Sequence, residues 1–385
     1  MKRCRALLNN LELTLESPNS AKRIAITNQY AYHPSLQFPR FLFSQFALLH
    51  LLSDEFPHRV RTNFLVDAEI KSIIDAMYAS MKKRPPVFAV PNDHRHFRTY
   101  PRTNPERVAI AYSGGKDSMW NLMRAEKQYG MDNVLVIHIH GLNKGAGSEE
   151  LAYTKLQQEK IGFRNLKVIS IKNSAGVGGH NVMRSRDIFL AGIAIPEALA
   201  FGASKIMIEG FSETSPDEPF SGQEKNMIFF NHVLGRLHIP VRIDWENKNE
   251  MDVMKELVLE RPEWVTYVCN CFLNPLFRRG QRPRWHTYAP SFPLLDSQCG
   301  SCVKCRITNL GRLLYDPAMA AVKKEDVEYF LKSCVLWYQK KIQTHADMIA
   351  GSFRRELITA LEKYDLAHLI SAVVTAGPVR NQRAV

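Results

Sequence analysis

Short hydrophobic runs alternate with amphipathic segments between residues 107 and 260 of this chain. The runs are rich in β-branched residues, and each predicts a strand. They are the segments "RVAIAY", "NVLVIHIHG", "LKVISI", "KIMIEG" and "VRIDW". Segments with helical spacing and glycine stops lie between them, such as "DSMWNLMRAEKQYG" and "SEELAYTKLQQEKIG". Strands that alternate with helices predict an α/β fold with an open parallel five-stranded sheet and helices on both faces.

The pattern changes on either side of this region. Before it, one possible strand and two amphipathic helices predict an N-terminal accessory domain. After Arg261 the alternation stops, and the end of the chain is helical in pattern. The expected organisation is an accessory domain at 1–104, an α/β domain at 105–262, a cysteine-rich segment at 263–312 and a helical C-terminal region at 313–385.

Composition and charge narrow the class of protein. The chain has 385 residues, of which 45% are hydrophobic, as in globular proteins. It contains no apolar run near the ~20 residues that span a bilayer, and its N-terminus is a poor signal peptide, so we expect a cytoplasmic protein without a membrane partner. The formal net charge of +13 favours a polyanionic partner such as a nucleotide, a nucleic acid or an acidic protein. A basic solvated surface without a partner is the alternative.

The segment "AYSGGKDSMW", Ala111–Trp120, joins the first predicted strand to a helix. Backbone N–H groups and the helix dipole converge at such a junction, and glycines let the backbone approach a phosphate. The spacing is not that of a Walker loop. Lys116 adds charge or points to solvent, and Asp117 serves as an N-cap or binds Mg²⁺ beside the phosphates. The alternative is a plain strand–loop–helix turn.

Ser-Gly-Gly-x-Asp-Ser after a buried strand resembles the signature of the PP-loop ATP pyrophosphatases, over roughly Arg107 to Asn309. The resemblance implies the fold of the adenine-nucleotide α-hydrolases (the HUP class), with the pyrophosphate of ATP in the loop and attack at the α-phosphate. Adenine is then expected near Ala111, Tyr112 and Ile137–His140. The cofactor-binding residues expected are Tyr112, Ser113, Gly114, Gly115, Lys116, Asp117, Ser118, His138, Gly210 and Glu213. The catalytic residues expected are Asp117, Lys116 and Arg186.

Five of the seven cysteines are clustered in two places. "CGSCVKC" contains Cys299, Cys302 and Cys305, and "CNC" contains Cys269 and Cys271. In a cytosolic chain such clusters indicate metal binding or catalysis. A structural zinc site needs four ligands, so either Cys269 or Cys271 is expected to complete it. An iron–sulfur cluster and free thiols are the alternatives.

The cysteine cluster downstream of a PP-loop resembles the 7-cyano-7-deazaguanine synthase branch. "SRDIFLAGIA" and "GFSET" resemble that branch's segments at Arg186 and at Gly210–Thr214, although Asp187 stands where asparagine is usual. The resemblance implies activation of 7-carboxy-7-deazaguanine by ATP and attack by ammonia, giving the amide and then the nitrile, with structural zinc. Arg186 is expected to pair with the carboxylate or to stabilise charge at phosphorus. Glu213 and Asp217 are expected to hold Mg²⁺ or substrate nitrogens, or to cap the loop.

The chain departs from that branch in its extra length and in Lys116, where glutamine is common. Extended relatives occur in antiphage defence operons, where a protein amine takes the activated acyl group. Two enzyme hypotheses therefore remain: synthesis of a deazaguanine amide or nitrile, and transfer of the activated acid to a macromolecule, by a homodimer or a larger complex. A sulfur-transferring tRNA-modifying enzyme with redox-active Cys269 and Cys271 is a third hypothesis. A nucleotide-binding scaffold is the fourth.

Overall fold

The computed structural model describes most of the chain. The described residues are 10–17, 20–28, 30, 32, 38–54, 56–88, 99–141, 147–173, 186–208, 210–211, 224–269, 292–293, 295, 298, 300 and 302–375. The chain divides into two compact units, and each is described by itself. The first unit comprises Met1–Ser113, Arg124–Gly210 and Pro219–Glu246; the second comprises Gly114–Met123, Phe211–Glu218 and Asn247–Val385.

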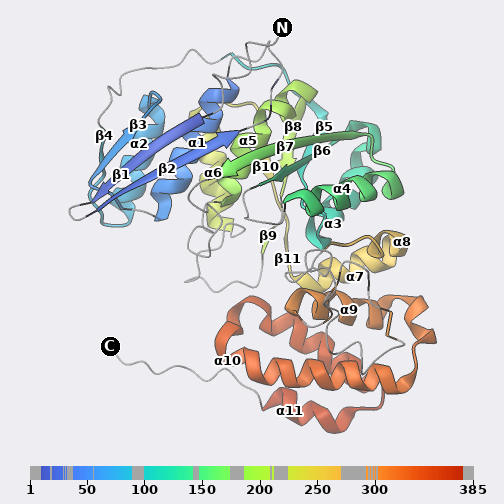
Figure 1. Cartoon of the computed structure of the whole chain (residues 1–385). Helices are drawn as coiled ribbons and strands as arrows, with labels where there is room; N and C mark the ends of the chain where they lie inside the picture. The colour runs from blue at the N-terminus through green and yellow to red at the C-terminus, as the bar shows by residue number, and fades with distance from the viewer. Residues whose placement is uncertain are drawn as a thin grey trace. The chain divides into compact units, whose positions relative to one another are not determined.

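The first unit contains, within the described residues, a nine-stranded mixed and largely parallel open sheet (Figure 1). The strand order is β10-β8-β5-β6-β7-β2-β1-β3-β4. The strands in chain order are β1 (Asn10–Ser17), β2 (Ser20–Asn28), β3 (Arg59–Thr62), β4 (Val87–Phe88), β5 (Asn104–Ala111), β6 (Val134–His140), β7 (Asn165–Asn173), β8 (Ala203–Met207) and β10 (Arg242–Asp244).

The five strands predicted from the hydrophobic runs are β5, β6, β7, β8 and β10, and their pairings are all parallel, as predicted. The sheet is wider than the predicted five strands, because β2 pairs antiparallel with β7 through Ile26–Asn28. The four added strands come from the residues predicted to form an accessory domain. They extend the same sheet instead of starting another, because β7 alone would leave an unpaired edge. The predicted domain boundaries stay predictions.

One face of the sheet is covered by four helices: α1 (Pro39–Asp54), α2 (Ala68–Ser80), α5 (Arg186–Phe201) and α6 (Glu224–Arg236). Side chains alternate along each strand. Ala109 of β5 and Ile137 of β6 therefore belong to this core, and α1 packs closely on α5 (Figure 1). A Cβ built on Gly192 of α5 would lie 2.4 Å from the Cβ of Phe46, so only glycine fits this crossing.

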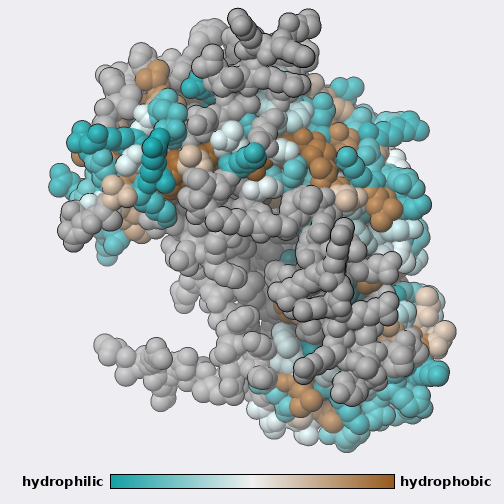
Figure 2. All heavy atoms as spheres, in the orientation of Figure 1, coloured by the Kyte–Doolittle hydropathy of each residue, from teal (hydrophilic) through white to brown (hydrophobic). Residues whose placement is uncertain are grey.

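The opposite face of the sheet is covered by α4 (Gly147–Ile161), which contacts β6. The side of α4 toward the sheet carries Tyr153, Thr154 and Gln157, all buried. The face of the molecule seen in Figure 2 carries both hydrophilic and hydrophobic residues among those that the structure describes. The short helix η1 (Met131–Asn133) precedes β6.

The second unit is mainly helical, which confirms the predicted helical C-terminal region (Figure 1). Its helices are α7 (Glu250–Glu260), α8 (Pro262–Val265), α9 (Val303–Tyr315), η5 (Pro317–Ala321), α10 (Lys324–Lys363), η6 (Ala367–Leu369) and α11 (Ile370–Val374). Two short strands, β9 (Gly210–Phe211) and β11 (Asn247–Lys248), form a two-stranded sheet. The helix α3 (Lys116–Tyr129) begins in this unit and ends in the first. In the part of the chain that the structure describes, no helix is both long and apolar enough to cross a membrane.

Candidate functional site

The glycine loop, residues 112–118 including the first residues of α3, follows β5, the strand at which the strand order reverses. The chain passes from β5 to β6 and β7 on one side, and then to β8 and β10 on the other. Ligands of open α/β sheets bind beyond the carboxyl end of the strand at such a switch point. The division between the two units falls between Ser113 and Gly114, so the strand side of the loop belongs to the first unit and the helix side to the second.

On the helix side, Gly114 has a φ of 78°, a conformation that favours glycine. The first turn of α3 is closed by the N–H of Met119, which donates to the carbonyl oxygen of Gly115 at 3.0 Å. The hydroxyl of Ser118 donates to the same carbonyl oxygen, also at 3.0 Å. The loop is therefore a tight turn into a helix N-terminus, the geometry that suits an anion.

Lys116 is fully buried and does not point to solvent. Its Nζ lies 2.6 Å from Oδ1 of Asp117 and 3.4 Å from Oε2 of Glu250, the first residue of α7. Both carboxylate side chains are only 14% exposed. A buried ammonium group is costly unless charges of opposite sign face it, so these two carboxylates account for its burial.

A second set of contacts joins the first half of α3 to the middle of α7. The indole N–H of Trp120 donates to Oε2 of Glu256 at 2.7 Å. Lys248 pairs with the other carboxylate oxygen of Glu256, and its Nζ lies 5.3 Å from the centre of the Trp120 ring. Asn249 caps α7 by accepting from the N–H of Asp252. The helix α7 is thereby fixed against the helix that carries the glycine loop.

Sequence reasoning missed Glu250, Glu256 and Lys248 as neighbours of the glycine loop. The weak local signal was an N-cap asparagine followed by an acidic residue. That signal fixes where a helix begins and carries no information on what its first turn faces.

The cysteine-rich segment contacts the glycine loop through its backbone. The N–H of Cys269 donates to the carbonyl oxygen of Gly114 at 2.9 Å. Cys302 is half-buried and Cys305 is buried, and their Sγ atoms lie 3.4 Å apart at the start of α9. Two thiolates on one tetrahedral zinc lie roughly 3.8 Å apart, given Zn–S bonds of about 2.3 Å. This pair therefore fits one edge of a zinc site.

Cys271 and Cys299 lie outside the described residues. Among the residues that the structure describes, no group of three His, Cys, Asp or Glu side chains is arranged to hold a metal ion. Cys269 therefore does not form a three-ligand group with Cys302 and Cys305. The choice between Cys269 and Cys271 as the fourth ligand stays open, as predicted.

On the strand side of the loop, the N–H of Tyr112 donates to the carbonyl oxygen of Ile137 at 2.9 Å and extends the β5–β6 pairing. His138 is buried below Tyr112, with Nδ1 3.0 Å from the Tyr112 carbonyl oxygen and 3.3 Å from Oγ1 of Thr154. Burial lowers the pKa of His138 to about 4. The ring is neutral at pH 7, and because a carbonyl oxygen can only accept, Nδ1 carries the proton.

His140, two residues further along β6, lies nearer the surface. Its Nε2 is 2.5 Å from Oγ of Ser170 on β7, and the two residues are neighbours in the register of these strands. Burial lowers the pKa of His140 below its ordinary value. The carboxyl ends of β6 and β7 thus present neutral imidazole and hydroxyl groups, which suit a polar, uncharged ring.

The described part of the structure includes only some of the remaining predicted site residues. Arg186 is the first residue of α5, but its side chain and that of Asp187 lie outside the described set, as do Glu213 and Asp217. Gly210 begins β9. The predicted roles of these residues stay predictions.

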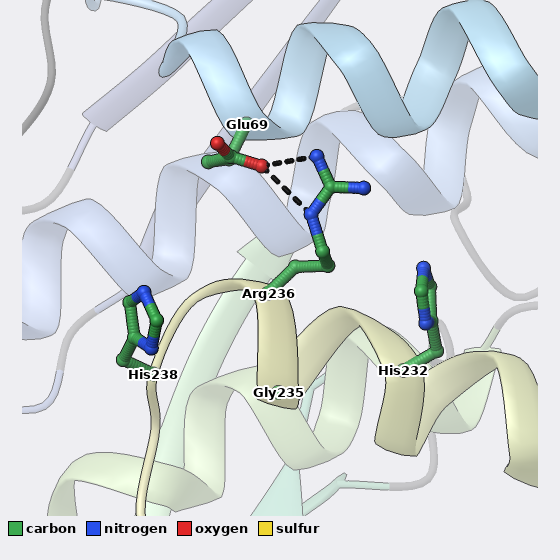
Figure 3. Close-up of a pocket in the computed structure, with 5 residues that line it drawn as sticks. All are labelled: Glu69, His232, Gly235, Arg236 and His238. Carbon is green, nitrogen blue, oxygen red and sulfur yellow. Dashed lines mark hydrogen bonds and ion pairs between the residues drawn. The ribbon is translucent and has the colours of Figure 1, made fainter.

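A surface hollow of about 310 Å³ lies elsewhere in the first unit, between α2 and the end of α6 (Figure 3). It is lined by Glu69, His232, Gly235, Arg236 and His238. Arg236 lies at its centre and donates to Oε2 of Glu69, from Nε at 2.9 Å. The arginine is thus already neutralised, and a helix C-terminus attracts cations more than anions. The hollow is a poor place for a phosphate or carboxylate ligand.

Comparison with known proteins assigns neither a family nor a function to the chain. The chain matches no protein-family model, and no curated protein matches it significantly. The candidate function therefore depends on the chemistry of the residues themselves.

Proposed function

We propose that the chain is a cytoplasmic PP-loop enzyme of the 7-cyano-7-deazaguanine synthase type that uses ATP to adenylate a carboxylate, with release of pyrophosphate. The observation that carries the proposal is the position of the loop containing Ser-Gly-Gly-Lys-Asp-Ser. It follows β5, where the strand order of the parallel sheet reverses, and it opens α3. Both features favour a nucleotide phosphate at this loop.

In the proposed reaction, a carboxylate oxygen of the acid forms a bond to the α-phosphorus of ATP. The bond from that phosphorus to the bridging oxygen breaks, and pyrophosphate leaves with the electron pair. The α3 N-terminus and the turn at Gly114 hold the pyrophosphate, while Asp117 faces its cation. When bound with ATP, Mg²⁺ supplies positive charge against the phosphate oxygens.

The acid that we propose is 7-carboxy-7-deazaguanine. The support for this step is the resemblance carried by Arg186, by Gly210–Thr214 and by the cysteine cluster, together with the close Sγ atoms of Cys302 and Cys305. Zinc, when bound there, supplies a structural crosslink. An amine then attacks the acyl adenylate, forming a C–N bond and releasing AMP; the amine is ammonia or an amino group of a partner protein.

The experiment is an assay of AMP and pyrophosphate from labelled ATP, with 7-carboxy-7-deazaguanine and ammonium. Product should depend on the acid. Asp117→Asn should lower the rate at least about 100-fold while the protein stays folded, as expected for a group beside the reacting phosphates. Asp132→Asn, which removes the same charge from an exposed site, is the control. Absence of acid-dependent pyrophosphate release with any amine would reject the proposal.

The two possible amines are separated by a second measurement. Mass spectrometry of proteins that co-purify with the chain would detect a covalent mass increase corresponding to the acyl group on a partner. A free amide or nitrile in the small-molecule fraction would instead identify ammonia. If pyrophosphate release depends on tRNA and not on the acid, a tRNA-modifying activity replaces the proposal.

A further inference from the structure

Lys116 is the residue at which the glycine loop differs from the usual motif, and it is fully buried. Two carboxylates face its Nζ: Asp117 at 2.6 Å and Glu250 at 3.4 Å. Oε2 of Glu250 is buried and accepts no hydrogen bond from the described residues, so the ammonium group is what compensates its charge. The three side chains together carry one positive and two negative charges.

The two carboxylates are not equivalent in position. Asp117 is in the first turn of α3, at the end of the glycine loop, where the phosphates and their cation are proposed to bind. Glu250 is on α7, which is fixed against α3 by the contacts of Trp120, Glu256 and Lys248. Asp117 is therefore free to change its partner when a nucleotide binds, whereas Glu250 is held in place.

We infer that Glu250 is a positioning residue for the nucleotide site, acting through Lys116. It keeps the Lys116 ammonium group in place when Asp117 releases it and turns to the cation of Mg–ATP. Without Glu250, nucleotide binding has to break the closest ion pair of a buried lysine, which costs free energy. The inference rests on the proposed function, since it assumes that the glycine loop binds ATP.

The experiment measures equilibrium binding of Mg²⁺ with a non-hydrolysable ATP analogue, by calorimetry, in the full chain. Glu250→Gln should raise the Kd about tenfold, with a smaller effect on the rate at saturating ATP. Glu260→Gln removes the same charge from the exposed far end of α7 and should leave the Kd unchanged within about twofold. Circular dichroism and thermal unfolding establish that each variant is folded.

The decisive measurement repeats the substitution in a Lys116→Gln background. There the two carboxylates face each other without an ammonium group between them, so Glu250→Gln should no longer weaken binding and should tighten it slightly. A residue with a purely structural role would weaken binding in both backgrounds. If Glu250→Gln does not fold, Glu250→Asp is tested in its place. This variant should raise the Kd by about threefold, and the increase should vanish in the Lys116→Gln background.

The outcomes separate this inference from the proposed function. Wild-type binding of the analogue together with an unchanged Kd for Glu250→Gln, or equal losses in both backgrounds, overturns the role of Glu250 only. Failure of the wild-type chain to bind the analogue at all overturns both.

Discussion

The backbone N–H of Cys269 donates a hydrogen bond to the carbonyl oxygen of Gly114 at 2.9 Å. Gly114 has a positive φ and is the point at which the glycine loop turns toward α3. Cys269 lies two positions before Cys271, in the segment proposed to reach the zinc ligands. The cysteine-rich segment and the turn at Gly114 are therefore joined by a contact between main-chain atoms, which does not involve the Cys269 side chain.

Removal of zinc should consequently weaken nucleotide binding. Without the metal the segment around Cys269 loses its anchor, and the bond to Gly114 is made less often. We expect the Kd for a Mg–ATP analogue to rise by about tenfold in chelator-treated protein, and to recover when zinc is added back. Calorimetry on both forms measures this, with circular dichroism to show that the overall secondary structure persists. Equal affinity of the two forms would show that the contact does not depend on the metal.

Serine substitutions should identify the zinc ligands. Cys302→Ser and Cys305→Ser should each lower the zinc content well below one ion per chain, because each removes one of four ligands. One of Cys271→Ser and Cys269→Ser should do the same, because one of these two cysteines is predicted to complete the site. Cys334→Ser is the control, since this thiol is buried on α10 beside Arg306. Metal analysis of the five proteins measures this. The substitution at 269 or 271 that loses zinc identifies the fourth ligand, retention of zinc in both would contradict the predicted site, and iron with visible absorbance would replace zinc.

The parallel strands were predictable because each is a short hydrophobic run with β-branched residues, and the central residues of β5 and β6 are buried on both faces of the sheet. Val108, Ile110, Val134 and Val136 are all fully buried in the structure. The width of the sheet was not predictable in the same way. The strand at 20–28 has a visible pattern, but its pairing with β7 joins residues far apart in sequence, and one hydrophobic strand can complete any open edge.

The same limit applies to the site. A local motif predicted the glycine loop, because its chemistry depends on neighbouring residues. The burial of Lys116 depends on Glu250, and the Trp120–Glu256 bond joins residues 136 positions apart. A lysine in a loop has no local feature that distinguishes a buried ion pair from a solvated side chain, so the sequence left both possibilities open.

Gly192→Ala should destabilise the first unit through the contact between α1 and α5. The added Cβ would lie 2.4 Å from both Cβ and Cγ of Phe46, so the helices have to separate. Overpacking of this kind costs about 1–3 kcal/mol of unfolding free energy. Gly235→Ala is the matched control, because a Cβ on this α6 glycine meets nothing within 4 Å. It should leave stability unchanged or raise it by up to about 1 kcal/mol. Urea unfolding of both variants gives the comparison, and equal stabilities would show that α1 does not pack closely on α5.

Buried His138 should make the first unit less stable as the pH falls. Its pKa is about 4 in the folded state, because of burial, against an ordinary value of 6.5. Between these pH values the unfolded chain binds a proton that the folded chain does not. The contribution of His138 to stability is therefore fully present above about pH 6.5 and declines as the pH falls toward 4.

The pKa difference at His138 lowers the unfolding free energy by on the order of 3 kcal/mol once the pH is below both pKa values. Each pKa unit of this difference corresponds to about 1.4 kcal/mol. His138→Asn keeps a side-chain N–H that can reach the Tyr112 carbonyl oxygen but cannot titrate in this range. The unfolding free energy of the variant should therefore fall less steeply between pH 7 and pH 4.5 in urea titrations. His232→Gln, at an exposed histidine of α6, should retain the wild-type slope. If His138→Asn and wild type show the same slope, His138 is protonated in the folded state and its proposed tautomer is wrong.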